Sequence, residues 1–127
     1  MDCVFCARIH SGDVEVSNDH AVAFGDAFPL SDGHALIVPR RHESDLFRLT
    51  PIERVAVWAL LDDVHAIVGD RFKPDGFNIG ANVGEPAGQT VGHAHVHLIP
   101  RIRGDVDDPR GGIRWVLPDR AVYWEKR

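Results

Sequence analysis

The chain has 127 residues, of which 44% are hydrophobic and 26% are charged, and its net charge is −5. This composition excludes disordered and fibrous proteins, and the length suits a single domain with a buried core. An acidic balance argues against sequence-independent binding of nucleic acid, which needs a basic surface, and no segment has the pattern of a membrane span or a signal peptide. We therefore expect a soluble, cytoplasmic protein that binds neither nucleic acid nor membranes.

Short strands are predicted on both sides of one long helix. The helix is expected from Pro51 to Val68, because Thr50 is a good N-cap, Glu53 completes a capping box and Gly69 is a typical stop. Apolar residues recur along it at helical spacing and would face a sheet. The predicted strands cover residues 14–17, 21–25, 35–39, 76–81 and 93–100. Neighbouring strands around a single helix favour an α+β fold with an antiparallel sheet.

Residues 106–127 are predicted to form a C-terminal tail that follows the domain formed by residues 1–105. The tail is expected to be ordered but mostly irregular, because it is too apolar to remain in water. Its apolar residues include Trp115, Val116, Leu117, Tyr123 and Trp124. We expect the tail to pack on its own domain or on a partner subunit.

Three histidines alternate with apolar residues in "HAHVHLI", which ends at Ile99. On a strand, His93, His95 and His97 would lie on one face. Neighbouring rings would be about 6.6 Å apart and the outer two about 13 Å apart, so one zinc ion could bind two of them but hardly three. A neutral imidazole can instead attack phosphorus and form a covalent phosphoramidate. His95, with a histidine on each side, is the predicted nucleophile.

A glycine-rich loop leads into these histidines. The stretch "GEPAGQTVGH", from Gly84 to His93, offers backbone N–H groups that could cradle an anion. Gln89 stands where a P-loop would have its lysine, so magnesium-dependent hydrolysis of nucleoside triphosphates is not implied. Together, the loop and the histidines favour a phosphate site.

These residues resemble the histidine triad (HIT) superfamily, whose motif is His-φ-His-φ-His-φ-φ, where φ is an apolar residue. Four more segments are similar to family segments and occur in family order: "DCVFCARI" (2–9), "DGHALIVPRRH" (32–42), "GFNIGANVGEPAGQTV" (76–91) and "IPRIRGD" (99–105). The resemblance is nearest to the dinucleoside-polyphosphate hydrolase and phosphorylase branch and to bacterial HIT proteins. It implies a five-stranded antiparallel sheet with one long and one short helix, paired into a ten-stranded sheet in a homodimer. The alternative is a monomer whose tail covers the sheet edge.

By position, the resemblance assigns catalytic roles to four histidines. His95 would attack the α-phosphorus of an adenylylated substrate, either a dinucleoside polyphosphate or an AMP phosphoramidate, and form a nucleotidyl-histidine. His97 and His34 would align that ring and assist proton movement, and His93 would contact the phosphoryl group or serve elsewhere. The substrate would be a purine nucleotide with an AMP moiety. Its base would lie in a pocket walled by Phe5, Ile9 and Phe28, and its ribose hydroxyls would bind Asp26. Asn82, Gln89 and Thr90 would hold the phosphate oxygens and the leaving group.

Several of these residues also have a plainer interpretation. His34 could be only a turn residue, and Asp26 only a surface carboxylate. Gln89 and Thr90 could bond to the backbone of their own loop, and the three apolar residues could belong to the core.

Cys3 and Cys6 are the two cysteines of the chain and have a CxxC spacing. Several bacterial members of the resembled family combine such a pair with two histidines, which maps to a Cys₂His₂ zinc site of Cys3, Cys6, His42 and His93. A zinc site of this kind is closed and structural, so no catalytic cofactor is expected. The alternative is a pair of reduced, partly buried thiols.

Two other functions remain open at this point. A metal-dependent hydrolase would use two of the triad histidines, but no Asp or Glu beside the triad completes its ligand set. A nucleotide-binding or sensing protein would bind AMP tightly and show little turnover.

Overall fold

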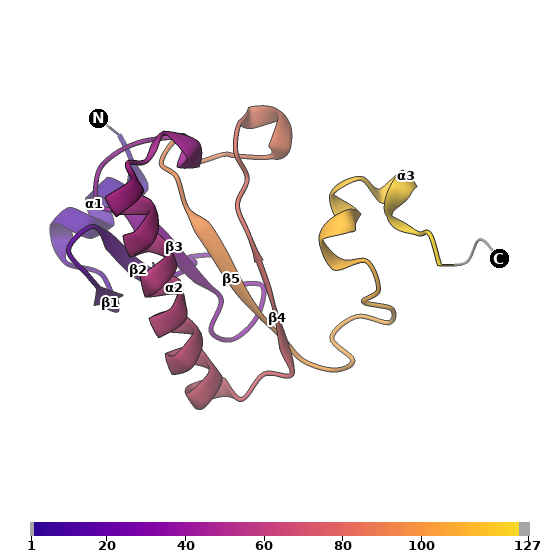
Figure 1. Ribbon diagram of the computed structural model, residues 1–127. Helices are drawn as coiled ribbons and strands as arrows, with labels where there is room; N and C mark the ends of the chain where they lie inside the picture. Colours follow the sequence, from indigo (N-terminus) through magenta and orange to yellow (C-terminus); the bar gives the residue numbers. More distant parts are fainter. Residues whose placement is uncertain (1, 125–127) are drawn as a thin grey trace.

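The computed structural model describes residues 2–124 and has the predicted α+β fold. A five-stranded antiparallel sheet has the strand order β1-β2-β3-β5-β4, and α2 lies along one of its faces (Figure 1). The strands are β1 (Val16–Ser17), β2 (Ala21–Gly25), β3 (Ala35–Pro39), β4 (Gly76–Gly80) and β5 (Val96–Arg101). The α-helices are α1 (Val4–Ser11), α2 (Pro51–Phe72) and α3 (Pro118–Ala121). Short 3-10 turns are η1 (Leu46–Arg48), η2 (Glu85–Ala87) and η3 (Gly112–Val116).

Both faces of strands β2 and β3 are buried. On the α2 face, strand residues such as Ile37 and Leu98 share an apolar cluster with Leu60 and Val64 of the helix. A second cluster joins α1 to the opposite face and contains Phe5, Val22, Phe24, Leu36 and Val38. Because β2 and β3 bury side chains on both faces, their sequences are continuous apolar runs rather than alternating ones. Within the described residues, no helix combines the length and the hydropathy needed to cross a membrane.

The long helix α2 ends later than predicted. Gly69 lies inside it, and Lys73 ends it in the left-handed conformation (φ 51°), with its N–H donating to the Gly69 carbonyl (3.0 Å). The reason is tertiary packing, because Phe72 lies against Gly33, where a Cβ atom would be 2.7 Å from the Phe72 ring. Gly69 therefore lies inside the helix despite the cost of about 1 kcal/mol that glycine has there relative to alanine. The predicted stop at Gly69 is therefore wrong.

The predicted capping box at the start of α2 is confirmed and is joined by an arginine. Thr50 Oγ1 accepts from the Glu53 N–H (3.2 Å), and Glu53 Oε1 accepts from the Thr50 N–H (2.9 Å). Arg41 donates to both carboxylate oxygens of Glu53, at 2.9 and 3.0 Å. These Arg41 bonds, followed by the Thr50 backbone bond, lower the pKa of Glu53 from 4.5 to about 2.

This capping carboxylate predicts a pH dependence of stability. A pKa that is lower in the folded state adds stability above the unfolded pKa, and this contribution is lost as the pH falls through the folded pKa. The stability advantage of wild type over Glu53→Gln should therefore shrink between about pH 5 and pH 2. Urea unfolding of both proteins at stepped pH measures this difference. An advantage that stays constant over this range would contradict the prediction, and Arg41→Gln should weaken the pH dependence.

Strand β5 begins at Val96, so its predicted start at His93 is wrong, whereas the other strands lie within two residues of their predicted bounds. The backbone before Val96 bonds outside the sheet. The Ala94 N–H donates to the Glu43 carbonyl (2.7 Å), and the His93 carbonyl accepts from the His95 ring (2.8 Å). These bonds hold the segment in place without a strand ladder.

The C-terminal tail contains η3 and α3 and lies beside β4 (Figure 1). It approaches β4 through Ile113, whose Cδ1 is 3.8 Å from the position of a Cβ on Gly80. The apolar tail residues Trp115, Val116 and Leu117 remain 44%, 74% and 62% exposed. The domain thus covers the tail only in part, and packing on a partner subunit stays a prediction.

Candidate active site and metal cluster

The three triad histidines form one row of rings, although only His97 lies in a strand. Phe5 of α1 contacts the rings of His93 and His95, with centroid distances of 6.0 and 5.0 Å, and His95 lies 5.2 Å from His97. The row therefore faces the α1 side of the sheet, while Val96 and Leu98 face α2. This confirms the predicted division of the motif between two faces.

The hydrogen bond of His95 fixes which nitrogen carries a lone pair. Its Nδ1 lies 2.8 Å from the backbone carbonyl oxygen of His93. A carbonyl oxygen only accepts, so Nδ1 must carry the hydrogen and donate. In the neutral ring Nε2 then has the free lone pair, which is the form that a nucleophile needs.

A second chain of hydrogen bonds fixes His34 and His97. The Leu30 N–H donates to His34 Nδ1 (3.0 Å), so the hydrogen of the neutral His34 ring lies on Nε2 and donates to His97 Nδ1 (2.9 Å). Neutral His97 therefore carries its hydrogen on Nε2. Burial lowers the pKa of both His34 and His97, which favours the neutral rings.

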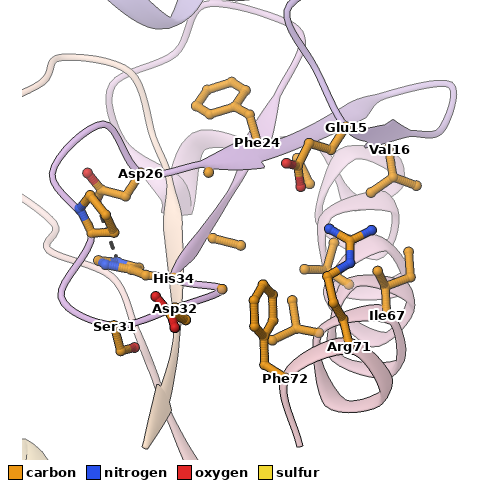
Figure 2. Close-up of a pocket in the computed structure, with 17 residues that line it drawn as sticks. Glu15, Val16, Phe24, Asp26, Ser31, Asp32, His34, Ile67, Arg71 and Phe72 are labelled. Atoms are coloured by element: carbon orange, nitrogen blue, oxygen red, sulfur yellow. Dashed lines mark ion pairs between the residues drawn. The ribbon is translucent and has the colours of Figure 1, made fainter. Parts of the chain in front are cut away.

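The Asp26 carboxylate lies beside this histidine pair. Its Oδ2 is 3.4 Å from His34 Nε2 and 3.8 Å from His97 Nδ1, and its Oδ1 accepts from the Phe28 N–H (2.9 Å). Figure 2 shows Asp26 and His34 facing each other at one end of a groove of about 560 Å³ that extends to Arg71 near the end of α2. Asp26 opposes the lowering of both histidine pKa values, but burial is the larger effect.

The four predicted metal ligands come together in a tight cluster. Sγ of Cys3 and Sγ of Cys6 lie 3.4 and 3.5 Å from Nδ1 of His93, and Sγ of Cys6 lies 3.4 Å from Nδ1 of His42. The two Nδ1 atoms are 3.3 Å apart. Tetrahedral zinc has bonds of about 2.3 Å to sulfur and 2.0–2.1 Å to nitrogen. These bonds require a sulfur–nitrogen distance of about 3.5 Å and a nitrogen–nitrogen distance of about 3.3 Å between ligand atoms. The donor set and its spacing therefore fit zinc.

The buried His93 ring is oriented by the protein backbone. Its Nε2–H donates to the Pro39 carbonyl (2.7 Å), which leaves the Nδ1 lone pair directed at the cysteines and His42. His93 is thus one of the four residues of the possible metal-binding cluster, while its carbonyl accepts from Nδ1 of His95. One residue links the cluster to the predicted nucleophile.

The predicted substrate ligands differ in how the structure places them. Gln89 bonds within its own region, accepting from the Gly84 N–H (2.9 Å) and donating to the Ser44 and Val91 carbonyls (2.8 and 3.0 Å). The plainer interpretation of Gln89 thus describes this structure. Phe5 is buried beside His95, and Ile9 is half-buried against the apolar cluster that contains Phe5. Asn82, Thr90 and Phe28 are exposed.

Sequence reasoning missed the backbone groups that set the ring orientations. These are the Leu30 N–H, the His93 carbonyl and the Pro39 carbonyl. Every residue has such groups, so no side-chain pattern marks the ones that act. Only the folded chain reveals them.

The HIT domain family matches residues 10–104 of this chain. An uncharacterised HIT-like protein of Mycoplasma genitalium is 36% identical over 102 residues, covering 78% of this chain and 72% of that protein. The asymmetrical bis(5′-nucleosyl)-tetraphosphatase of Schizosaccharomyces pombe is 36% identical over 88 residues, covering 69% of this chain and 48% of that protein. A solved Zn-bound histidine triad family protein of Mycobacterium smegmatis is 34% identical, with a TM-score of 0.72 and coverage of 83% of this chain and 78% of that one. By sequence and by fold, this chain belongs to the histidine triad (HIT) family.

Proposed function

We propose that this protein is a nucleotide hydrolase or transferase that cleaves the α-phosphate linkage of adenylylated substrates through a nucleotidyl-His95 intermediate. The observation that carries the proposal is the hydrogen bond from His95 Nδ1 to the His93 carbonyl, which leaves a lone pair on Nε2. Family membership and the similarity to a bis(5′-nucleosyl)-tetraphosphatase support a nucleotide substrate.

The proposed reaction has two steps. His95 Nε2 attacks the α-phosphorus, a nitrogen–phosphorus bond forms, and the bond to the leaving oxygen breaks with its electron pair on that oxygen. Water, or phosphate in a phosphorolysis, then attacks the phosphorus and returns the electron pair to Nε2. When water attacks, one of its protons is released to solvent. Nδ1 keeps its hydrogen throughout, so the His93 carbonyl can hold the ring in both steps.

The neutral His34–His97 pair favours one class of leaving group. His97 Nε2–H can donate a hydrogen bond, but a neutral imidazole is too weak an acid to give up that proton. A polyphosphate leaves as an anion and needs no proton, whereas the amine of a phosphoramidate needs one. The geometry therefore supports dinucleoside polyphosphates over AMP phosphoramidates.

A second cluster of possible metal ligands among residues 2–124 gives little support to a metal-dependent hydrolase. Asp26, His34 and His97 offer three ligand atoms within 4.8 Å. The Leu30 N–H, however, keeps the hydrogen of neutral His34 on Nε2, the nitrogen that would have to bind the metal. We therefore assign this trio to hydrogen bonding rather than to a metal.

The proposed intermediate can be detected directly. Rapid quenching during turnover of diadenosine tetraphosphate, followed by intact-mass analysis, should show one AMP unit on wild type and none on His95→Ala. Binding of AMP without an adduct or turnover would instead identify a nucleotide sensor.

The nucleoside of the adenylyl half is proposed to lie against Phe5 and Ile9, with the Asp26 carboxylate accepting from its ribose hydroxyls.

We further propose that Cys3, Cys6, His42 and His93 bind a structural zinc ion. The ligand spacing and the similarity to a Zn-bound HIT protein support this assignment. With four protein ligands, zinc there would supply a cross-link and would leave no position open for substrate.

We also propose a homodimer in which a second copy covers the edge of β4. Strand β4 is at one end of the sheet order, and such edges are usually paired or covered. Exposed apolar residues, Ile79 on β4 and Leu117 in the tail, support this. Light scattering should give twice the mass of one chain for wild type, and less for Ile79→Lys combined with Leu117→Asp. One chain mass at every wild-type concentration would contradict the dimer and favour the monomer whose tail covers this edge.

A further inference from the structure

A cavity of about 660 Å³ lies between the tail and strands β4 and β5 of the sheet. Ile99 and Arg101 line it and follow His97 on the same face of β5, where burial alternates from residue to residue. Same-face neighbours on a strand are about 6.6–6.8 Å apart, so the cavity begins one such step beyond His97. Leu30 also lines it, and the Leu30 N–H binds His34, the partner of His97. Through Ile99 and Leu30, the lining of the cavity is therefore adjacent to the proposed active site.

The tail supplies the wall opposite β5. Ile113, Trp115 and Val116 of η3 line the cavity, and the tail lies beside β4 (Figure 1). The Trp115 indole is oriented because its Nε1–H donates to the Arg110 carbonyl (2.9 Å), yet the residue is 44% exposed. An aromatic ring that is both oriented and accessible is a surface on which a planar group can stack.

The charged groups of the lining are paired within the protein. Arg101 donates to both carboxylate oxygens of Asp105 (2.7 and 2.8 Å) and to Asn78 (2.7 Å). Asp108 accepts from Arg110 (2.8 Å). With these charges paired, the lining suits an uncharged, planar and partly apolar group better than a further phosphate chain.

We propose that this cavity binds the second nucleoside of a dinucleoside polyphosphate, with its base stacked on Trp115. The inference rests on the proposed function: His95 acts on the adenylyl half, and the leaving nucleotide extends past His97 along the same face. Trp115 and Ile113 are then residues that determine specificity for the leaving group, and the chemistry at His95 does not depend on them.

Two matched substrates test the cavity. Diadenosine tetraphosphate and adenosine 5′-tetraphosphate share the adenylyl half and four phosphates; the second lacks the second nucleoside and ends in a phosphate monoester instead. Trp115→Ala should lower kcat/KM for the first relative to the second by about tenfold, as expected for the loss of one base–aromatic stack. Trp115→Phe should retain most of the preference. Trp58→Ala, at an exposed tryptophan on α2, is the matched control and should leave the ratio unchanged.

A binding measurement separates this inference from the proposed function. Calorimetry on His95→Ala protein, which should not turn over either compound, should show a preference for diadenosine tetraphosphate that Trp115→Ala removes. That result would support binding of the second nucleoside in the cavity even if no nucleotidyl-histidine is found. Equal affinities for the two compounds would overturn this binding even if the nucleotidyl-histidine is present. The inference would also be overturned if Trp115→Ala left the preference for diadenosine tetraphosphate unchanged and altered the oligomeric mass. In that case Trp115 would pack against a second copy of the chain and not against a nucleoside.

Discussion

Replacement of His95 by alanine is expected to lower kcat/KM for adenylylated substrates by at least about 10⁴-fold, because it removes the atom that forms the covalent intermediate. The neighbouring groups stay in place, since His97 is held by His34 and the carbonyl of His93 belongs to the backbone. Steady-state release of AMP, measured for wild type and variant under the same conditions, gives the ratio directly.

Two controls make this result specific. Unfolding of His95→Ala should be measured as well, because His95 is buried against Phe5 and its removal leaves a cavity. His20→Ala, at an exposed histidine before β2, should retain wild-type turnover. Turnover that persists in folded His95→Ala at more than about a hundredth of the wild-type rate would eliminate the covalent mechanism.

Loss of the proposed zinc ion is expected to have the largest effect on stability. The cluster joins α1, through Cys3 and Cys6, to His42 after β3 and to His93 before β5. Structural zinc contributes about 10–16 kcal/mol to the folding of zinc-finger peptides, which lack a core of their own. In this domain, which has a core, we expect the Cys3→Ser, Cys6→Ser double variant to lose about 5 kcal/mol of unfolding free energy.

Metal analysis and denaturant unfolding together check the zinc prediction. Wild type should contain one zinc per chain and be destabilised by a chelator, whereas the double variant should contain none and be insensitive to it. His10→Ala, at an exposed histidine near the cysteines, is a control that should keep the metal. Wild type that is purified with zinc present, binds none and is unaffected by chelator would contradict the assignment.

Loss of zinc should also affect His95 through the backbone. The His93 side chain belongs to the cluster, and the His93 carbonyl accepts from His95 Nδ1. We therefore expect His95 to be less well oriented in zinc-free protein than in the loaded protein.

Much of the fold could be predicted because its signals are local. The cap at Thr50 and Glu53 depends on residues three apart, so the sequence predicts both of its hydrogen bonds. The alternation from His93 to Leu98 likewise indicates which side chains share a face, and the structure agrees even where no strand forms. The four proposed metal ligands were identified only through the family resemblance, because three separate segments supply them.

The sequence by itself determined the α+β class, the row of rings with His95 at its centre and the start of α2, because each depends on side chains a few residues apart. The tertiary structure decided the rest. The packing of Phe72 against Gly33 extends α2 past Gly69, and the Pro39 carbonyl, 54 residues before His93, sets which nitrogen of the His93 ring bears the hydrogen. The cavity lined by Trp115 forms between the tail and β5, which are separate in the sequence. The physical reason is that packing and hydrogen-bond partners distant in sequence can override local secondary-structure preferences. The sequence pattern does not indicate which distant residues will be in contact.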